Sequence, residues 1–166
     1  MAKSQTVVIR GEGSWAKVFE SNRDMYEWNE ETAKFDAPSS TDGSYTINVA
    51  LEMDEYKKLK RSGSLAAKNS KENEVGLEVV KLRRPHVKRG KEGKVLDFAS
   101  GAPKVVNDMG LPWDFERDGL IGNGSDVEVT LVVYETAYSP GTRLEKIKVI
   151  NNIPVETDKD GEDIPF

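Results

Sequence analysis

A run of basic residues between positions 81 and 94 is the strongest chemical feature in the body of the chain. Clustered cations of this kind attract the phosphates of a polyanion. Gly90 and Gly93 interrupt the run, so we expect a basic loop beside a groove, the alternative being a solvated surface patch. His86, inside the run, could add a phosphate contact. The basic members are Lys81, Arg83, Arg84, Lys88, Arg89, Lys91 and Lys94, against the single acidic residue Glu92.

Aromatic side chains near these cations would extend the chemistry to unpaired bases, because stacking on a flat ring contributes roughly 1–3 kcal/mol per base. Trp15 and Lys17 share one strand and both face outward if Ala16 and Val18 face the core, although the opposite orientation fits the sequence equally well. Tyr134 lies on the face of its strand opposite four aliphatic residues. We therefore add Trp15, Lys17 and Tyr134 to the candidates for binding a single strand.

Side chains suited to catalysis are scarce. The absence of cysteine excludes disulfides, thiolate metal ligands and cysteine nucleophiles, and the single histidine excludes a multi-histidine metal site and makes a catalytic triad unexpected. Asp114, Glu116 and Asp118 alternate and could chelate a divalent ion, which makes a metal-dependent nuclease a third hypothesis. We expect a protein that is not an enzyme and needs no cofactor or metal.

Residues 156–166 form a separate acidic segment. Five carboxylates and one lysine account for most of the net charge of −5, and no apolar residue comes before Ile164. Such a segment cannot bury enough apolar surface to offset its ordering entropy, so we expect a disordered, solvated tail after a domain spanning 1–155. Its apolar end, beside a carboxylate, suits a partner pocket with a basic rim. The candidate partner-binding residues are Asp160, Glu162, Asp163, Ile164, Pro165 and Phe166.

Strand patterns dominate the elements that must position these residues. Gly11 and Gly13 indicate a bulge or bend, residues 20–42 are polar and loop-like, and one helix ends in a second basic cluster at 57–61. Several strands with one short helix and no βαβ alternation predict a mainly β fold, either a small antiparallel barrel or a sandwich. Strands are expected at 6–10, 45–51, 76–84, 126–134 and 144–155, with weaker candidates at 95–98 and 104–106.

Two parts of the chain resemble known single-stranded DNA-binding proteins. Asp163-Ile-Pro-Phe166 resembles the C-terminal tip of the bacterial proteins. Trp15-Ala-Lys-Val-Phe-Glu20, Lys57-Lys-Leu-Lys60 and Ile121-Gly-Asn-Gly-Ser-Asp126 resemble, in order and spacing, bacteriophage single-stranded DNA-binding proteins with an OB-fold. The resemblance covers most of the chain and implies an OB-fold-like five-stranded barrel, with one face and its loops holding an oligonucleotide. The long excursion at 20–42 and the lack of a Gln/Pro-rich linker argue against a bacterial-type tetramer, and a homodimer is left open.

These observations together predict a protein that coats single-stranded DNA without sequence specificity in phage DNA replication, recombination or repair, in the host-cell cytoplasm. The acidic tail would compete with DNA and, once released, recruit replication and recombination proteins. No window approaches the roughly 20 apolar residues of a membrane span, so no membrane association is expected. The alternative is an OB-like adaptor that binds host repair proteins or duplex DNA, and preference for single over double strands would distinguish the two.

Overall fold

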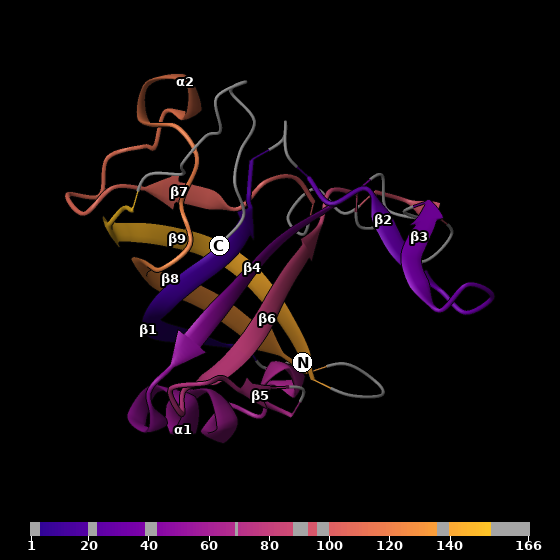
Figure 1. Ribbon diagram of the computed structural model, residues 1–166, viewed down its shortest axis with the longest axis horizontal. Helices are drawn as coiled ribbons and strands as arrows, with labels where there is room; N and C mark the ends of the chain where they lie inside the picture. The colour runs from indigo at the N-terminus through magenta and orange to yellow at the C-terminus, as the bar shows by residue number, and fades with distance from the viewer. Residues whose placement is uncertain are drawn as a thin grey trace.

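The computed structural model describes residues 4–19, 23–38, 43–68, 70–87, 93–95, 100–135 and 140–153. Figure 1 shows the arrangement of the elements. In chain order they are β1 (Ser4–Lys17), β2 (Tyr26–Asn29), β3 (Lys34–Pro38), β4 (Ser44–Leu51), α1 (Met53–Arg61), the 3₁₀ helix η2 (Leu65–Ala67), β5 (Lys71–Glu72), β6 (Glu78–Pro85), β7 (Lys104–Val106), α2 (Phe115–Asp118), β8 (Ser125–Tyr134) and β9 (Gly141–Asn151).

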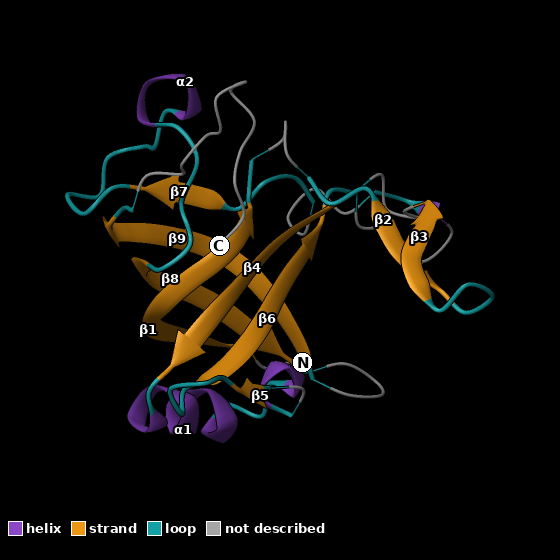
Figure 2. Cartoon of the chain, viewed as in Figure 1, coloured by secondary structure: helices purple, strands orange, loops and turns teal. Residues whose placement is uncertain are grey.

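Seven of the strands form one sheet in the order β5-β6-β4-β1-β8-β9-β7. The sheet curls until β6 contacts β9, so that the strands from β6 to β9 in this order enclose a barrel (Figure 1). Each neighbouring pair from β6 to β9 is antiparallel, so β6 and β9 run in the same direction. These two strands also lie close together, as the curled sheet in Figures 1 and 2 shows, and the Arg84 guanidinium on β6 donates to the Leu144 carbonyl on β9 at 3.2 Å. The predicted mainly β, OB-fold-like barrel is confirmed.

The long strand β1 joins the two halves of the barrel. Residues 4–13 pair with β8, whereas residues 12–17 pair with β4. A Cβ atom on Gly11 would lie 2.2 Å from the Ala50 carbonyl oxygen, so only glycine permits this close approach of β4. The register breaks between Ser14 and Lys17, which confirms the expected bulge but places it after the two glycines.

Alternating side chains from the barrel strands fill the core. On β8 the residues predicted to share one face, Val127, Val129, Leu131 and Val133, are all buried. Period-two alternation buries every second side chain of a curled sheet against the same interior. The core cluster also contains Val7, Ile9, Val18, Ile47, Val49, Leu51, Leu59, Val80, Leu82, Ile121, Leu144, Ile147 and Val149.

Within the polar excursion expected at 20–42, the described residues 23–38 contain more regular structure than the sequence suggested. It contains the antiparallel hairpin β2–β3, which stands away from the barrel (Figure 2). Tyr26 and Trp28 alternate with polar residues, and Ala33 has a left-handed φ of 54° in the connecting turn. The prediction of a loop here was therefore wrong in part, because short strands of mixed polarity have a weak alternation signal.

The remaining expectations concern short elements. The helix expected after the second strand is α1, and the weak candidate at 104–106 is β7. The candidate strand at 95–98 lies outside the described residues except for Val95. In the part of the chain that the structure describes, no helix is long and apolar enough to cross a membrane.

Candidate nucleic-acid interface

The outer surface of β1, β4 and β6 presents cations in neighbouring cross-strand positions. Lys17 on β1 and Arg83 on β6 both pair with Thr46 of β4, one from each side, and Lys81 pairs with Asn48 two residues along. The inward residues of β6 are Val80 and Leu82, so alternation directs Lys81 and Arg83 outward, and both are exposed. We call this surface, around Lys17, Lys81 and Arg83, the basic face.

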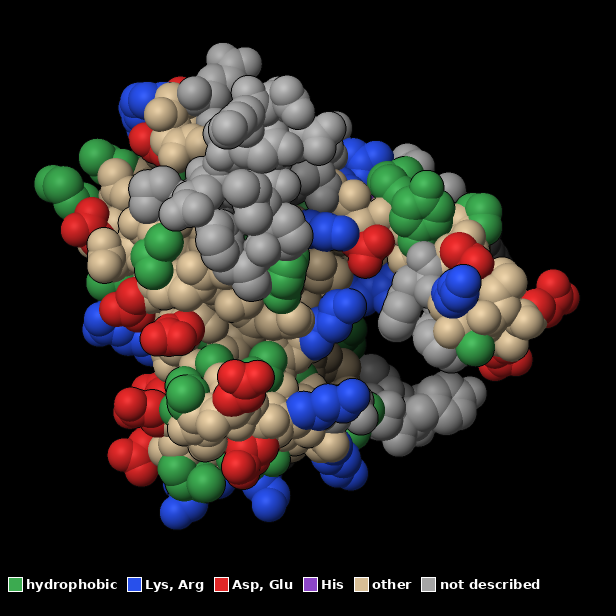
Figure 3. Space-filling model, in the orientation of Figure 1, with side chains coloured by type: hydrophobic (Ala, Val, Ile, Leu, Met, Phe, Trp, Pro, Cys, Tyr) green, Lys and Arg blue, Asp and Glu red, His purple; other side chains and the backbone are tan. Residues whose placement is uncertain are grey.

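Arg83 is oriented by its neighbour on β4. Its Nε and Nη2 atoms donate to Ser44 Oγ at 3.0 and 2.9 Å. One side of the guanidinium is thereby held against the sheet while the residue stays exposed. Figure 3 shows Lys and Arg side chains gathered along the side of the barrel formed by β4 and β6. A guanidinium held in this way has lost part of its conformational freedom before any ligand binds.

Trp15 owes its outward position to the bulge in β1. Val7 and Ile9 face the interior, but after the bulge the inward residue is Val18, so the inward parity changes from odd to even. Trp15 has a φ of 52° and its indole side chain leaves the residue 47% exposed. Its backbone N–H donates to Asn123 Oδ1 at 2.7 Å. The sequence left the orientation of Trp15 and Lys17 open, and the structure shows that both residues are exposed. An exposed aromatic ring is the kind of surface on which an unpaired base stacks.

Arg84 lies inside the protein rather than on the basic face. It is 7% exposed, and its guanidinium donates to the carbonyls of Gly101, Ser100 and Leu144 at 2.8, 2.9 and 3.2 Å. Glu145 on β9 lies 3.4 Å away and pairs with it. The guanidinium thus ties β6 to β9 and to the segment at 100–101, so we leave Arg84 out of the interface.

His86 also has a structural partner. Its Nδ1 lies 2.7 Å from the hydroxyl of Tyr45, a residue that is 0% exposed. A buried tyrosine hydroxyl needs a hydrogen-bond partner, and the imidazole supplies it. The two rings are tilted by 55° with centroids 5.8 Å apart. His86 therefore holds the end of β4 in place, and we leave it out of the interface as well.

Tyr134 is placed at the other end of β1 from Trp15. It pairs with Ser4, and a Cβ atom on Gly141 would lie 2.3 Å from its ring, so the ring covers this glycine. It also borders a hollow beside Ser62, at the end of α1. The structure therefore does not bring Tyr134 and Trp15 together.

Several predicted site residues lie outside the described part of the chain. Lys94 is described and exposed, whereas the other basic residues of the expected loop, from 88 to 91, lie outside the described ranges. The binding role of each remains a prediction. The residues outside the described ranges are Lys88, Arg89, Lys91, Asp160, Glu162, Asp163, Ile164, Pro165 and Phe166.

Two residues not singled out from the sequence lie near the basic face. Tyr26 is 57% exposed at the start of the hairpin, two residues after Asp24, whose backbone exchanges hydrogen bonds of 2.8 and 2.9 Å with Ser44. The hairpin is thus attached to the residue that orients Arg83. Lys71 on β5 is exposed and pairs with Val79, one outward position before Lys81. The alternation around Tyr26 was only a weak signal, and the pairing of Lys71 was not visible in the sequence.

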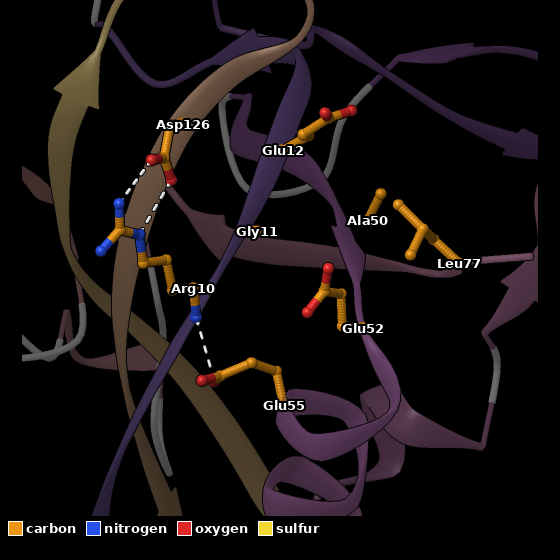
Figure 4. Close-up of a pocket in the computed structure, with 8 residues that line it drawn as sticks. All are labelled: Arg10, Gly11, Glu12, Ala50, Glu52, Glu55, Leu77 and Asp126. Carbon is orange, nitrogen blue, oxygen red and sulfur yellow. Dashed lines mark hydrogen bonds and ion pairs between the residues drawn. The ribbon is translucent and has the colours of Figure 1, made fainter. Parts of the chain in front are cut away.

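Acidic residues gather farther along the same strands, at the C-terminal end of β4 and the start of α1. A hollow of about 300 Å³ is bordered by four carboxylates and by Arg10, which pairs with Asp126 at 2.6 Å (Figure 4). The Arg10 backbone N–H donates to Glu55 Oε2 at 3.1 Å. The hydrogen bonds that the Arg10 guanidinium donates to Asp126 raise the pKa of Arg10 above its usual value. We call this region the acidic pocket; its carboxylates are Glu12, Glu52, Glu55 and Asp126.

Two of the three carboxylates considered for metal binding, Asp114 and Asp118, accept hydrogen bonds within a local turn. Asp118 Oδ2 accepts the Asp114 backbone N–H at 2.9 Å, and Arg117 pairs with Asp118 at 3.0 Å. The hydrogen bond from Arg117 holds the pKa of Asp118 below its usual value. Among the residues that the structure describes, no group of three or more His, Cys, Asp or Glu side chains could hold a metal ion. The nuclease hypothesis therefore has no support from this turn.

Comparison with known proteins yields similarity to solved structures but not to any family model or curated sequence. No protein-family model matches the chain, and no curated protein matches its sequence. Among solved structures, the chain is similar to the single-stranded DNA-binding protein from bacteriophage Enc34 in complex with single-stranded DNA. The identity is 15%, the match covers 91% of this chain and 88% of that chain, and the TM-score is 0.49. Because the similarity is this low, the function proposed below rests on the geometry of the basic face.

Proposed function

We propose that the protein binds single-stranded DNA without sequence specificity across the basic face, and that it acts by coating the strand and not by catalysis. The observation that carries this proposal is the group of Lys17, Lys81 and Arg83 on neighbouring strands of one face, together with the exposed Trp15 two residues before Lys17, in the bulge of β1. Cations hold the phosphates, while an aromatic ring accepts any unpaired base.

The arrangement also supports a preference for single strands. Trp15 is 47% exposed, and in this proposal an unstacked base lies flat against its ring. In a duplex each base is stacked between its neighbours and paired, and its flat surface is not accessible. Phosphate contacts alone would bind both forms, so the ring is the feature that favours the single strand.

The acidic tail fits the same proposal as a competitor for the basic face. Eleven residues span about 18 Å on average, by the scaling of roughly 5–6 Å × √n for flexible chains. In this proposal the carboxylates at 156–163 occupy the basic face when DNA is absent, and bound DNA displaces them. Ile164, Pro165 and Phe166 then become available to replication, recombination or repair proteins. Coating of strands in phage DNA metabolism, in the host-cell cytoplasm, is the role that suits such a protein.

The test is a fluorescence-anisotropy titration with a labelled oligo-dT and with a duplex of equal length, at two salt concentrations. We expect the single strand to bind more tightly, with a log–log salt slope of roughly −3 to −4 if four to six phosphates are contacted. A full-length variant with Asp160→Asn, Glu162→Gln and Asp163→Asn should bind more tightly, most of all at low salt. Equal affinity for duplex and single strand would instead favour the adaptor that binds duplex DNA or host repair proteins.

A further inference from the structure

Two hollows border the 3₁₀ helix η2, and both have basic rims. The first has a volume of about 250 Å³ and an apolar lining that includes Leu65, Leu82 and Leu144, and its two cations are Lys81 and Arg83 of β6. The second, of about 400 Å³, is bordered by Lys60 and Lys68 together with Ser64 and Ala67. The same short helix therefore separates the basic face from a second basic hollow, defined by Lys60 and Lys68.

The helix between the hollows is firmly attached to the barrel. Ser64 is 2% exposed, and its Oγ lies 2.5 Å from Thr142 Oγ1 on β9 and accepts the Ala66 N–H at 3.3 Å. From the other direction, the Tyr56 hydroxyl on α1 donates to the Ala67 carbonyl at 3.0 Å. A strand crossing η2 would thus meet a preformed surface and would cost little extra ordering of the protein.

The lysines of the second hollow are available to a ligand. Both Lys60 and Lys68 are exposed, and neither has an acidic partner within the described part of the chain. The helix dipole accounts for basic residues in the last turn of α1, but Lys68 lies beyond that helix. The acidic residues of α1 are in its first turn, at the end that faces the acidic pocket. The two ends of α1 therefore present opposite charges, and the basic end adjoins η2.

We propose that a single strand bound on the basic face continues over η2 and places further phosphates against Lys60 and Lys68. This inference rests on the proposed function and extends its footprint. Lys and Arg side chains lie along this side of the molecule, down to the region of α1 (Figure 3). Binding sites of about 4–16 nucleotides per OB-fold are common, so a path that includes the second hollow places this protein above the shortest footprints.

The test compares two oligo-dT lengths, one near 6 and one near 16 nucleotides, spanning about that range. The double variant Lys60→Glu/Lys68→Glu should weaken binding of the longer strand about 10-fold at low salt and change binding of the shorter strand less than about 2-fold. The milder pair Lys60→Gln/Lys68→Gln should have a smaller effect in the same direction. Lys104→Glu/Lys146→Glu, on the paired strands β7 and β9, makes the same change in charge away from the path and is the matched control.

The outcomes separate the inference from the proposed function. If the wild-type protein prefers single strands but the variant at Lys60 and Lys68 behaves like the control at both lengths, the second site does not exist and the proposed function stands. Equal weakening at both lengths would also contradict the inference, because it indicates a general charge effect. If the wild-type protein has no preference for single strands, the proposed function fails and the inference with it. Thermal unfolding of each variant verifies that the fold is intact.

Discussion

The basic face and the acidic pocket lie on the outer surface of the same strands, yet they present opposite charges. Along β4, outward positions 46 and 48 neighbour Lys17, Lys81 and Arg83, whereas position 50 and the residue after the strand border the acidic pocket. Within a few residues the surface changes from one that attracts phosphate to one that repels it. This difference teaches that a net charge of −5 does not argue against nucleic-acid binding, because strand pairing, and not composition, decides where each charge lies.

Reversing the charge of the basic face should have the largest effect. Lys81→Glu/Arg83→Glu removes two cations and adds two anions, so we expect roughly 100-fold weaker binding of oligo-dT at low salt and a salt slope smaller in magnitude by about 1.4. Anisotropy titrations at several salt concentrations measure both. Lys104→Glu/Lys146→Glu is the charge-matched control, and if it weakens binding as much, the difference between the two regions has no functional meaning.

Replacing Arg84 should affect stability instead of binding. Arg84→Met leaves the carbonyls of Ser100, Gly101 and Leu144 without this donor, and we expect a loss of about 2 kcal/mol in the free energy of unfolding. Urea unfolding measures it. The neighbouring change Arg83→Ala should leave the free energy of unfolding within about 0.5 kcal/mol of wild type while weakening DNA binding. The reverse pattern would mean that the two arginines have been assigned to the wrong faces.

Removing the aromatic ring should reduce affinity by a smaller amount. Trp15→Ala retains a Cβ atom at the same positive φ, so it removes the ring without relieving the backbone, and we expect about 10-fold weaker binding of oligo-dT. Binding of duplex DNA should change little. Trp113→Phe is the control, because the Trp113 indole N–H already donates to the Gly119 carbonyl and the ring packs against the core. Equal losses for duplex and single strand would argue against stacking on Trp15.

Removing one carboxylate of the acidic pocket should have the smallest effect on DNA binding. Asp126→Asn removes the partner of Arg10 in an exposed ion pair, and we expect less than about a 2-fold change in affinity for oligo-dT. The same titration at low salt measures it. A loss of affinity comparable to that of the basic-face variant would show that the strand passes over the acidic pocket, which would contradict the proposed path.

The sequence predicted the segments that form the candidate site better than the individual residues that belong to it. The basic run and the strand that leads into it were both recognised, and alternation along that strand already separates Arg83 from Arg84, because Val80 and Leu82 share the parity of Arg84. Treating every basic residue of the run as part of one binding cluster overlooked this difference between Arg83 and Arg84. The orientation of Trp15 was open because one unpaired residue in β1 reverses the inward parity. A hairpin attached through Asp24 and Ser44 depends on a contact between segments that local patterns do not encode.

The sequence by itself determined that this protein is mainly β, where most of its barrel strands lie, and that its basic residues cluster in one segment. These properties follow from local alternation and composition, both of which can be read from a single sequence. The tertiary structure decided which cations share a face, which arginine joins β6 to β9, and that η2 connects two basic hollows. Those outcomes depend on strand register, one bulge and closure of the barrel, and each of these arises from pairing between residues far apart in the chain.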